Sequence, residues 1–201
     1  MSEALTRRIE RRTRQRAANR GAILEAARRV AAREGAGNLS LRAVAAEAGY
    51  APASVYEYFR NRAELVLALA AEDMGSLART LRETSGGRAG EGALASAAKA
   101  VLAILRSSGA LPAAAATLED ADAPTEAERL FNGRLIAALT AFAEAGGLAP
   151  VRSRDDQADV VLAAAAVTGL AVLSRAGRLK TLGFDEDVLL QRLDKHFARA
   201  P

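Results

Sequence analysis

All three tyrosines of the chain, Tyr50, Tyr56 and Tyr58, lie within nine residues of one another. A phenolic hydroxyl can donate a hydrogen bond to a phosphate oxygen, and contacts of this kind position a protein on a nucleic-acid backbone without reading its bases. A hydrophobic core does not require such clustering. These residue types at this spacing therefore favour binding to phosphate groups.

The sequence offers few residues that could catalyse a reaction or bind a metal ion. The chain has no cysteine and one histidine, His196, so thiolate metal sites, multi-histidine metal sites and a Cys–His nucleophile are excluded. There is no glycine-rich phosphate loop. The acidic residues Glu119, Asp120 and Asp122 are more typical of a solvated helix face than of a metal site. We therefore expect no enzymatic activity, no metal ion and no cofactor.

The tyrosines belong to the segment SLRAVAAEAGYAPASVYEYFRNRAEL, which runs from Ser40 to Leu65. Within it, Ala45, Gly49 and Val55 stand four and six residues apart. Two crossing helices need this spacing, because a small side chain allows close approach, a glycine makes the turn and a branched apolar residue closes the second helix. The segment therefore predicts a helix-turn-helix, which makes DNA binding the leading hypothesis.

Capping signals mark where these helices begin. Ser40 is a good N-cap for the first of the two helices. Pro52 suits the first turn of the second helix, which we expect to run to about residue 59. Asn61 begins a further, long helix, and we expect a capping box with Glu64 there.

The whole sequence predicts an all-α fold. Alanine is abundant, proline is scarce, and no run is rich in β-branched and aromatic residues. Apolar residues recur at helical spacing, and glycines and prolines separate about nine helices. A basic, polar segment from residue 1 to about 16 precedes them and is expected to be mobile when free. The expected helices are 15–34, 41–48, 52–59, 61–81, 93–106, 112–122, 124–145, 155–176 and 185–198.

Charge is distributed unevenly over the chain. The net charge is +4, yet residues 1–62 hold 13 arginines, no lysine and six glutamates, which gives +7 there and −3 elsewhere. A basic segment on a mildly acidic body is typical of a nucleic-acid-binding module joined to another domain. The sequence RRIERRTRQR near the N-terminus predicts an arm along the phosphate backbone or in a minor groove, although it could simply be a solubilising tail.

The pattern AxxAGYAPASVYEYFRNRAEL, with its flanks from Ile23 to Leu67, resembles the helix-turn-helix of the TetR family of transcriptional regulators. The resemblance implies a DNA-binding domain at residues 1–62 and a helical body at 63–201. The body would bind a small molecule and form a homodimer through residues about 155–199. The family further implies a repressor that binds a two-fold symmetric operator and is released by a ligand. The N-terminus lacks the apolar segment of a secretory signal, so we expect a cytoplasmic protein. A DNA-binding activator or a ligand-independent regulator of the same fold is the alternative.

The resemblance also implies which residues face DNA. The third helix would enter the major groove, and the expected contacts are Arg14, Arg20, Ser40, Arg42, Pro52, Ala53, Ser54, Tyr56, Glu57, Tyr58 and Arg62. The chain departs from the family pattern at Ala51, which cannot cap the third helix. Glu57 either accepts a hydrogen bond from a cytosine amino group or pairs with Arg60 three residues on.

Two features of the body have competing interpretations. Residues 155–176 are rich in small and apolar side chains, which suit either a subunit interface or a buried central helix. Their longest apolar run, Val160 to Leu173, is shorter than the roughly 20 residues that cross a bilayer, so no membrane partner is expected. Six residues are candidate ligand contacts, with a packed core as the alternative: Leu102, Leu105, Phe131, Leu135, Phe142 and Thr168.

Overall fold

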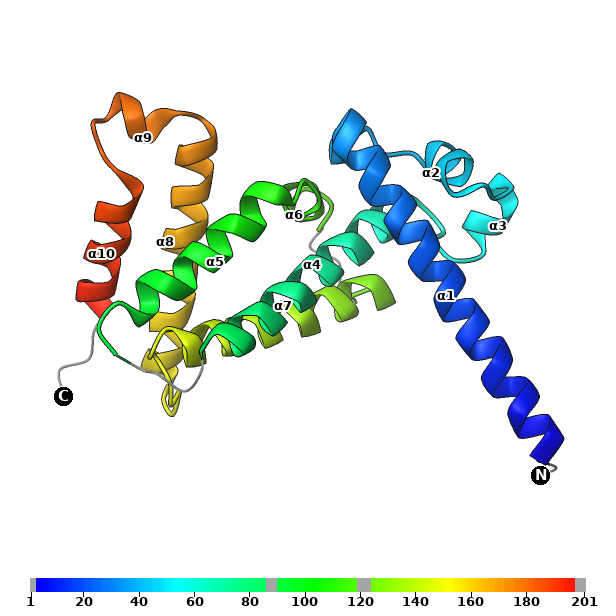
Figure 1. The fold of residues 1–201 in the computed structure, drawn as a ribbon, viewed down its shortest axis with the longest axis horizontal. Coiled ribbons are helices and arrows are strands. Elements are labelled where there is room, and N and C mark those ends of the chain that lie inside the picture. The colour runs from blue at the N-terminus through cyan, green and yellow to red at the C-terminus, as the bar shows by residue number, and fades with distance from the viewer. Residues whose placement is uncertain (1–2, 86–89, 119–123, 198–201) are drawn as a thin grey trace. The chain divides into compact units, whose positions relative to one another are not determined.

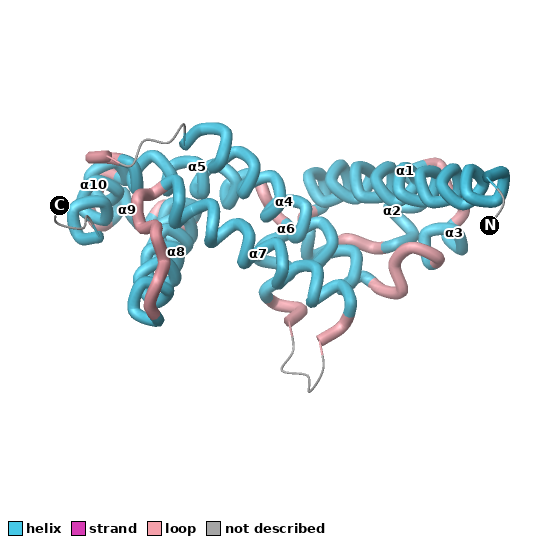
Figure 2. Tube along the Cα trace, turned by 90° about the horizontal axis from the view of Figure 1, so that it is seen from below, coloured by secondary structure: helices cyan, strands magenta, loops and turns pink. Residues whose placement is uncertain are grey.

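The computed structural model describes residues 3–85, 90–118 and 124–197, and every regular element in these ranges is a helix (Figures 1 and 2). This confirms the all-α fold. The elements are α1 (Glu3–Glu34), η1 (Ala36–Asn38), α2 (Leu41–Ala48), α3 (Pro52–Tyr56), α4 (Arg62–Ser85), α5 (Ala93–Ser107), α6 (Ala110–Ala115), α7 (Glu126–Ala145), α8 (Arg154–Arg175), α9 (Arg178–Thr181) and α10 (Glu186–Phe197).

The helices form two compact units. The head unit consists of residues 1–70 and 109–128, and the body unit consists of residues 71–108 and 129–201. The chain therefore passes between the units within α4, just before α6 and within α7. The domain boundary that we expected after residue 62 stays a prediction.

The first helix is longer than the sequence pattern predicted. We expected it to begin near Gln15, whereas α1 begins at Glu3 and runs unbroken for 32 residues. Arginine, glutamine, glutamate and alanine all favour helix, and no glycine or proline occurs in α1 before Gly21. A surface ion pair between Glu10 and Arg14, four residues apart, adds local support. The N-terminal arm is therefore helical from Glu3 on, and its mobility stays a prediction.

Three other differences from the predicted helices have local causes: the end of α3, the start of α6 and the presence of α9. α3 ends at Tyr56, and the chain continues as a turn in which the amides of Tyr58 and Phe59 both donate to the carbonyl of Val55. α6 begins at Ala110, which leaves Pro112 in the first turn, where its missing N–H costs no helical hydrogen bond. α9 was not predicted, because four residues between Gly177 and Gly183 are too few to show a helical period.

The expected caps are present, with one change. The Ser40 hydroxyl accepts a hydrogen bond from the amide of Ala43 at 3.2 Å, and the Asn61 side chain accepts from the amide of Glu64 at 2.9 Å. The Glu64 carboxylate accepts from the amide of Arg60 at 2.8 Å and not from that of Asn61. The capping box thus closes one residue before its expected position.

A carboxylate joins α1 and α2 of the head unit outside their apolar core. Glu47 of α2 accepts hydrogen bonds from Arg29 Nε at 2.6 Å and from Arg33 Nη1 at 2.8 Å, both on α1. These two hydrogen bonds hold the pKa of Glu47 below its usual value of 4.5.

A lowered pKa in the folded chain predicts a stability contribution that depends on pH. The contribution is complete above about pH 4.5, where an unfolded Glu47 is ionised, and it disappears as the pH falls through the lower pKa of the folded chain. We expect Glu47→Gln to lower the thermal midpoint at pH 7 and to leave it unchanged at the most acidic pH at which the chain still folds. Thermal unfolding of both proteins across this range measures the difference. An equal difference at every pH would contradict the ionic origin.

The body unit contains α5, α8 and α10, which pack against one another (Figure 1). The N-cap residue of α5 is Gly92, which has no side chain to cap the helix. Asp194 of α10, about one hundred residues later in the chain, caps the helix instead. Its carboxylate accepts hydrogen bonds from the amides of Gly92 and Leu94 at 3.0 Å and of Ala95 at 3.2 Å. This is a helix cap supplied by tertiary structure.

Removing this cap should destabilise the chain. Asp194→Ala leaves three amides at the positive end of a helix without their acceptor, which we expect to cost about 1–3 kcal/mol. For a chain of this size that lowers the thermal midpoint by about 2–10 °C. The matched control is Asp187→Ala on the same helix, since Asp187 pairs with Lys99 at 2.8 Å but both side chains are more than half exposed. Equal midpoints for the two variants would show that Asp194 does not cap α5.

Candidate nucleic-acid interface

The helix-turn-helix forms as the spacing of its residues predicts. Gly49 ends α2 with a φ of 70°, a left-handed conformation that glycine adopts without strain. The amide of Tyr50 then donates to the carbonyl of Ala45 at 2.9 Å, which closes the turn. Ala45 and Val55 are fully buried, so α2 and α3 cross closely. The head-unit core beneath them includes Ile23, Leu24, Val30 and Val44.

The predicted contact residues of α3 lie on the outside of the head unit. Pro52, Ala53, Tyr56 and Glu57 are exposed, and Tyr56 retains 50% of its accessible surface. Ser54 is partly buried, while the intervening Val55 points inward. Ala51 makes no side-chain cap, and Pro52 stands in the first turn, as expected. The short helix therefore offers one uncovered face.

The structure separates the two interpretations of Glu57. Arg60 does not pair with it: the Arg60 guanidinium lies 3.7 Å from the carboxylate of Glu64. Among the residues that the structure describes, Glu57 has no hydrogen-bond or ion-pair partner. An exposed carboxylate without a partner remains available as a hydrogen-bond acceptor on the outer face of α3.

Tyr58 is held by α1. The side-chain amide of Asn19 donates to the Tyr58 hydroxyl at 3.2 Å, which leaves the hydroxyl proton free to donate elsewhere. The Arg16 guanidinium lies over the Tyr58 ring at 5.7 Å, and that of Arg20 lies over the ring of Phe59 at 5.1 Å. Sequence reasoning missed Asn19 and Arg16, because no periodicity links residues 39 positions apart.

The remaining predicted contacts have different surroundings. Arg42 is exposed, and Ser40 is committed as an acceptor to its own helix. Arg62 Nη2 donates to the carbonyl of Ala36 at 3.1 Å, and its Nε is buried without a partner in the described residues, so this side chain lies largely against η1. Arg14 is exposed and lies 3.4 Å from Glu10. Their contacts with DNA stay predictions.

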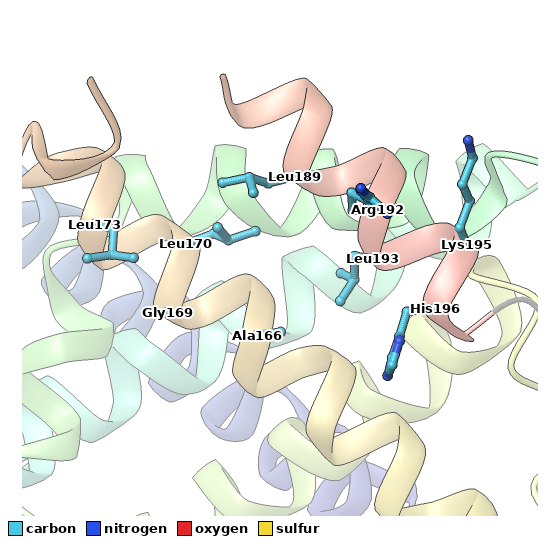
Figure 3. A pocket seen from close by; sticks show the side chains of 9 residues that line it. All are labelled: Ala166, Gly169, Leu170, Leu173, Leu189, Arg192, Leu193, Lys195 and His196. Atoms are coloured by element: carbon cyan, nitrogen blue, oxygen red, sulfur yellow. The ribbon is translucent and has the colours of Figure 1, made fainter. Parts of the chain in front are cut away.

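The six candidate ligand residues of the body unit differ in how far they are exposed. Leu102, Phe131 and Phe142 are buried, whereas Leu135 and Thr168 are exposed and Leu105 is partly buried. A groove of about 650 Å³ lies instead between α8 and α10 (Figure 3). None of the six lines it, and their role stays a prediction. The groove is lined by Ala166, Gly169, Leu170, Leu173, Leu189, Arg192, Leu193, Lys195 and His196.

Two further expectations concern metals and membranes. No group of three or more metal-ligating side chains occurs in the described ranges, and Glu119, Asp120 and Asp122 lie outside them. Among the described helices, α8 is long and apolar enough by composition to cross a membrane, and 22% of its apolar window is buried within the chain. A single helix of this kind is weak support for a membrane span.

The family model matches only the helix-turn-helix region, whereas the solved structures match most of the chain. Residues 23–69 match the model of the bacterial regulatory proteins of the tetR family. No curated protein matches the sequence. Among solved structures, a TetR transcriptional regulator from Rhodococcus sp. RHA1 is similar over 91% of this chain and 97% of its own, with a TM-score of 0.69 and 17% identity.

Two other solved structures are described with a bound partner. BioQ with its natural double-stranded DNA operator is similar over 89% of this chain and 97% of its own, with a TM-score of 0.55 and 21% identity. FadR from Bacillus subtilis in complex with stearoyl-CoA is similar over 88% of this chain and 96% of its own, with a TM-score of 0.57 and 18% identity. At these identities the likeness shows the fold, which is that of TetR regulators.

Proposed function

We propose that this chain, whose residues 23–69 form a DNA-binding domain of the tetR family, is a ligand-responsive transcriptional repressor. It would act as a homodimer on a two-fold symmetric operator and leave that operator when a small molecule binds the body unit. The observation that carries the proposal is the outer face of α3, which is uncovered on a helix-turn-helix that packs against the strongly basic helix α1. A regulator of this kind works on chromosomal DNA, so we place it in the cytoplasm.

The charge of the chain supports DNA as the partner. Residues 1–62 carry a net charge of +7, and Arg42 and Tyr56 beside the turn are exposed. Phosphate contacts from such side chains set the position of the protein, and residues on the outer face of α3 are then available to reach base edges in the major groove. BioQ, which shares the fold, binds a double-stranded DNA operator.

An uncovered apolar face on α8 supports the homodimer. One side of this helix is buried, with Val160, Ala163, Val167 and Ala171 facing the body unit. The opposite side is exposed and carries no charge between residues 160 and 174. A face of this extent is costly to leave in water and suits a second copy of the same helix. Its exposed residues are Val161, Leu162, Ala165, Ala166, Thr168, Gly169, Val172 and Leu173.

Fewer observations bear on the small-molecule effector and on whether the protein represses or activates transcription. FadR, a regulator of the same fold, binds stearoyl-CoA, which supports a small-molecule site in the body unit. A ligand that favours one spacing of the two heads over another would shift the population away from the DNA-binding form. A DNA-binding activator, or a regulator without a ligand, uses the same α3 face, and transcription from the target promoter with and without the protein separates these cases.

Titration against DNA tests the proposal. The full chain is titrated with a duplex from its own promoter region and with a random-sequence duplex, at several salt concentrations. We expect tighter binding to the promoter and a slope of about −0.9 in log K against log salt for each neutralised phosphate. A response that does not depend on salt, or equal affinity for both duplexes, would remove the basis for a sequence-specific regulator.

A further inference from the structure

The N-terminal half of α1 extends past α2 and α3 as a regular helix (Figures 1 and 2). Because the arm is helical, its arginines have fixed directions at about 100° per residue. Four of them stand four residues apart and form one slowly turning stripe, which we call the front row: Arg8, Arg12, Arg16 and Arg20. Three others lie on the far side of the helix and form the back row: Arg7, Arg11 and Arg14.

Contacts at one end of the front row show where it faces. Arg16 and Arg20 lie over the rings of Tyr58 and Phe59, which follow α3 directly. Arg8 and Arg12 continue the same stripe toward the N-terminus, within about a quarter turn of the direction set by these contacts. The back row points about 140–160° away from that direction. The front row therefore continues the side of the head unit on which α3 lies.

The charges at the free end of the front row are not neutralised within the head unit. Arg8 and Arg12 are exposed, and neither has an ion-pair partner in the part of the chain that the structure describes. Arg14, one of the DNA contacts expected from the sequence, lies in the back row beside Glu10, so it is not part of the contact proposed below. Residues 5–22 hold seven arginines and one acidic residue, so this helix carries a dense positive charge.

We propose that the front row is a second DNA contact, which binds the phosphate backbone beside the bases that α3 reads. The proposal rests on the DNA-binding function proposed above and adds Arg8, Arg12 and Arg16 to it. From Arg20 to Arg8 the row spans about 18 Å of helix. Each DNA strand presents a phosphate every 3.4 Å or so along the axis, so the row can reach several phosphates outside the base contacts.

The chemistry of the row favours phosphate over other partners. Arginine binds phosphate oxygens through two parallel hydrogen bonds and sheds its hydration more readily than lysine. Leu5 and Ile9 are exposed on the same side of α1. These two apolar side chains offer too little surface to seat a helix in a bilayer, which normally takes a full apolar face. An anionic membrane surface is therefore the competitor that the experiment must separate.

Two matched double variants of the full chain test the row: Arg8→Ala with Arg12→Ala in the front row, and Arg7→Ala with Arg11→Ala in the back row. Each removes two positive charges from exposed positions of α1 and introduces the strongest helix former, so the helix should persist in both. Circular dichroism checks this. Binding is measured on the promoter duplex, on a random-sequence duplex and on vesicles with and without phosphatidylserine.

We expect the front-row variant to lose about 1.8 from the magnitude of the salt slope per subunit, on both duplexes alike, because two phosphate contacts disappear. The back-row variant should keep the slope of the unmodified chain. Equal losses in the two variants would overturn the proposal in favour of a general charge effect. An unchanged slope on DNA, with binding to phosphatidylserine vesicles lost in the front-row variant alone, would overturn it in favour of a membrane. Failure of the unmodified chain to bind any duplex would refute the proposed function as well.

Discussion

Val172→Arg is expected to convert the chain into a monomer and to abolish operator binding at concentrations where the unmodified chain binds fully. Val172 is 63% exposed on the uncharged side of α8, so an arginine there is tolerated in a single subunit. In a dimer formed through α8, the charge would be buried without a partner. Such burial costs several kcal/mol for each subunit, and every 1.4 kcal/mol weakens association about tenfold.

Loss of the dimer should carry through to DNA because, in the proposed homodimer, the two heads read one symmetric site together. A single head keeps its own contacts but loses the second set, which the dimer holds close to its half-site. Sedimentation velocity measures the assembly state, and the promoter titration measures binding. The control is Ile136→Arg on α7, where the side chain is 65% exposed and lies outside the proposed interface. A dimeric Val172→Arg protein would place the interface elsewhere.

Glu57→Gln is expected to change the preferred base at one position of each half-site from cytosine to adenine. The Glu57 carboxylate has no partner in the described residues and can only accept hydrogen bonds, which matches the amino group that cytosine presents in the major groove. Glutamine can instead donate to and accept from adenine. A good contact of this kind discriminates by about 1–3 kcal/mol, or roughly 5- to 150-fold for each half-site.

Selection of bound duplexes from a randomised library measures this preference directly. Glu57→Ala should remove the preference at that position without creating a new one. Arg60→Ala is the neighbouring control, since Arg60 is paired with Glu64 and should leave base preference unchanged. An identical selected sequence for the unmodified chain and for Glu57→Gln would mean that Glu57 does not contact a base.

The helix-turn-helix was predictable because its signals are local. Ser40, Gly49 and Pro52 act on the backbone within a few residues, and the buried spacing of Ala45 and Val55 follows from helix geometry. Each of these features appears in the structure as the sequence predicts.

The features that could not be predicted from the sequence depend on residues far apart in the chain or on local effects that oppose one another, such as helix propensity and charge repulsion. The charge of the arm hides its helix, because helix propensity and the Glu10–Arg14 pair outweigh the repulsion between its arginines and α1 begins at Glu3. Asn19 meets Tyr58, and Asp194 meets the start of α5, only once the helices are packed. In the body unit, periodicity identifies an apolar face but not whether that face lines a cavity or fills one.

The position of α10 has a consequence for the lifetime of the protein. This helix completes the first turn of α5 through Asp194 and also borders the groove beside α8. In the proposed homodimer, a second subunit that docks along α8 and α10 would therefore also restrain the start of α5, about one hundred residues earlier in the chain. An orphan subunit would fray at that end first and become a substrate for proteases, so the cell would retain the paired form and clear the excess.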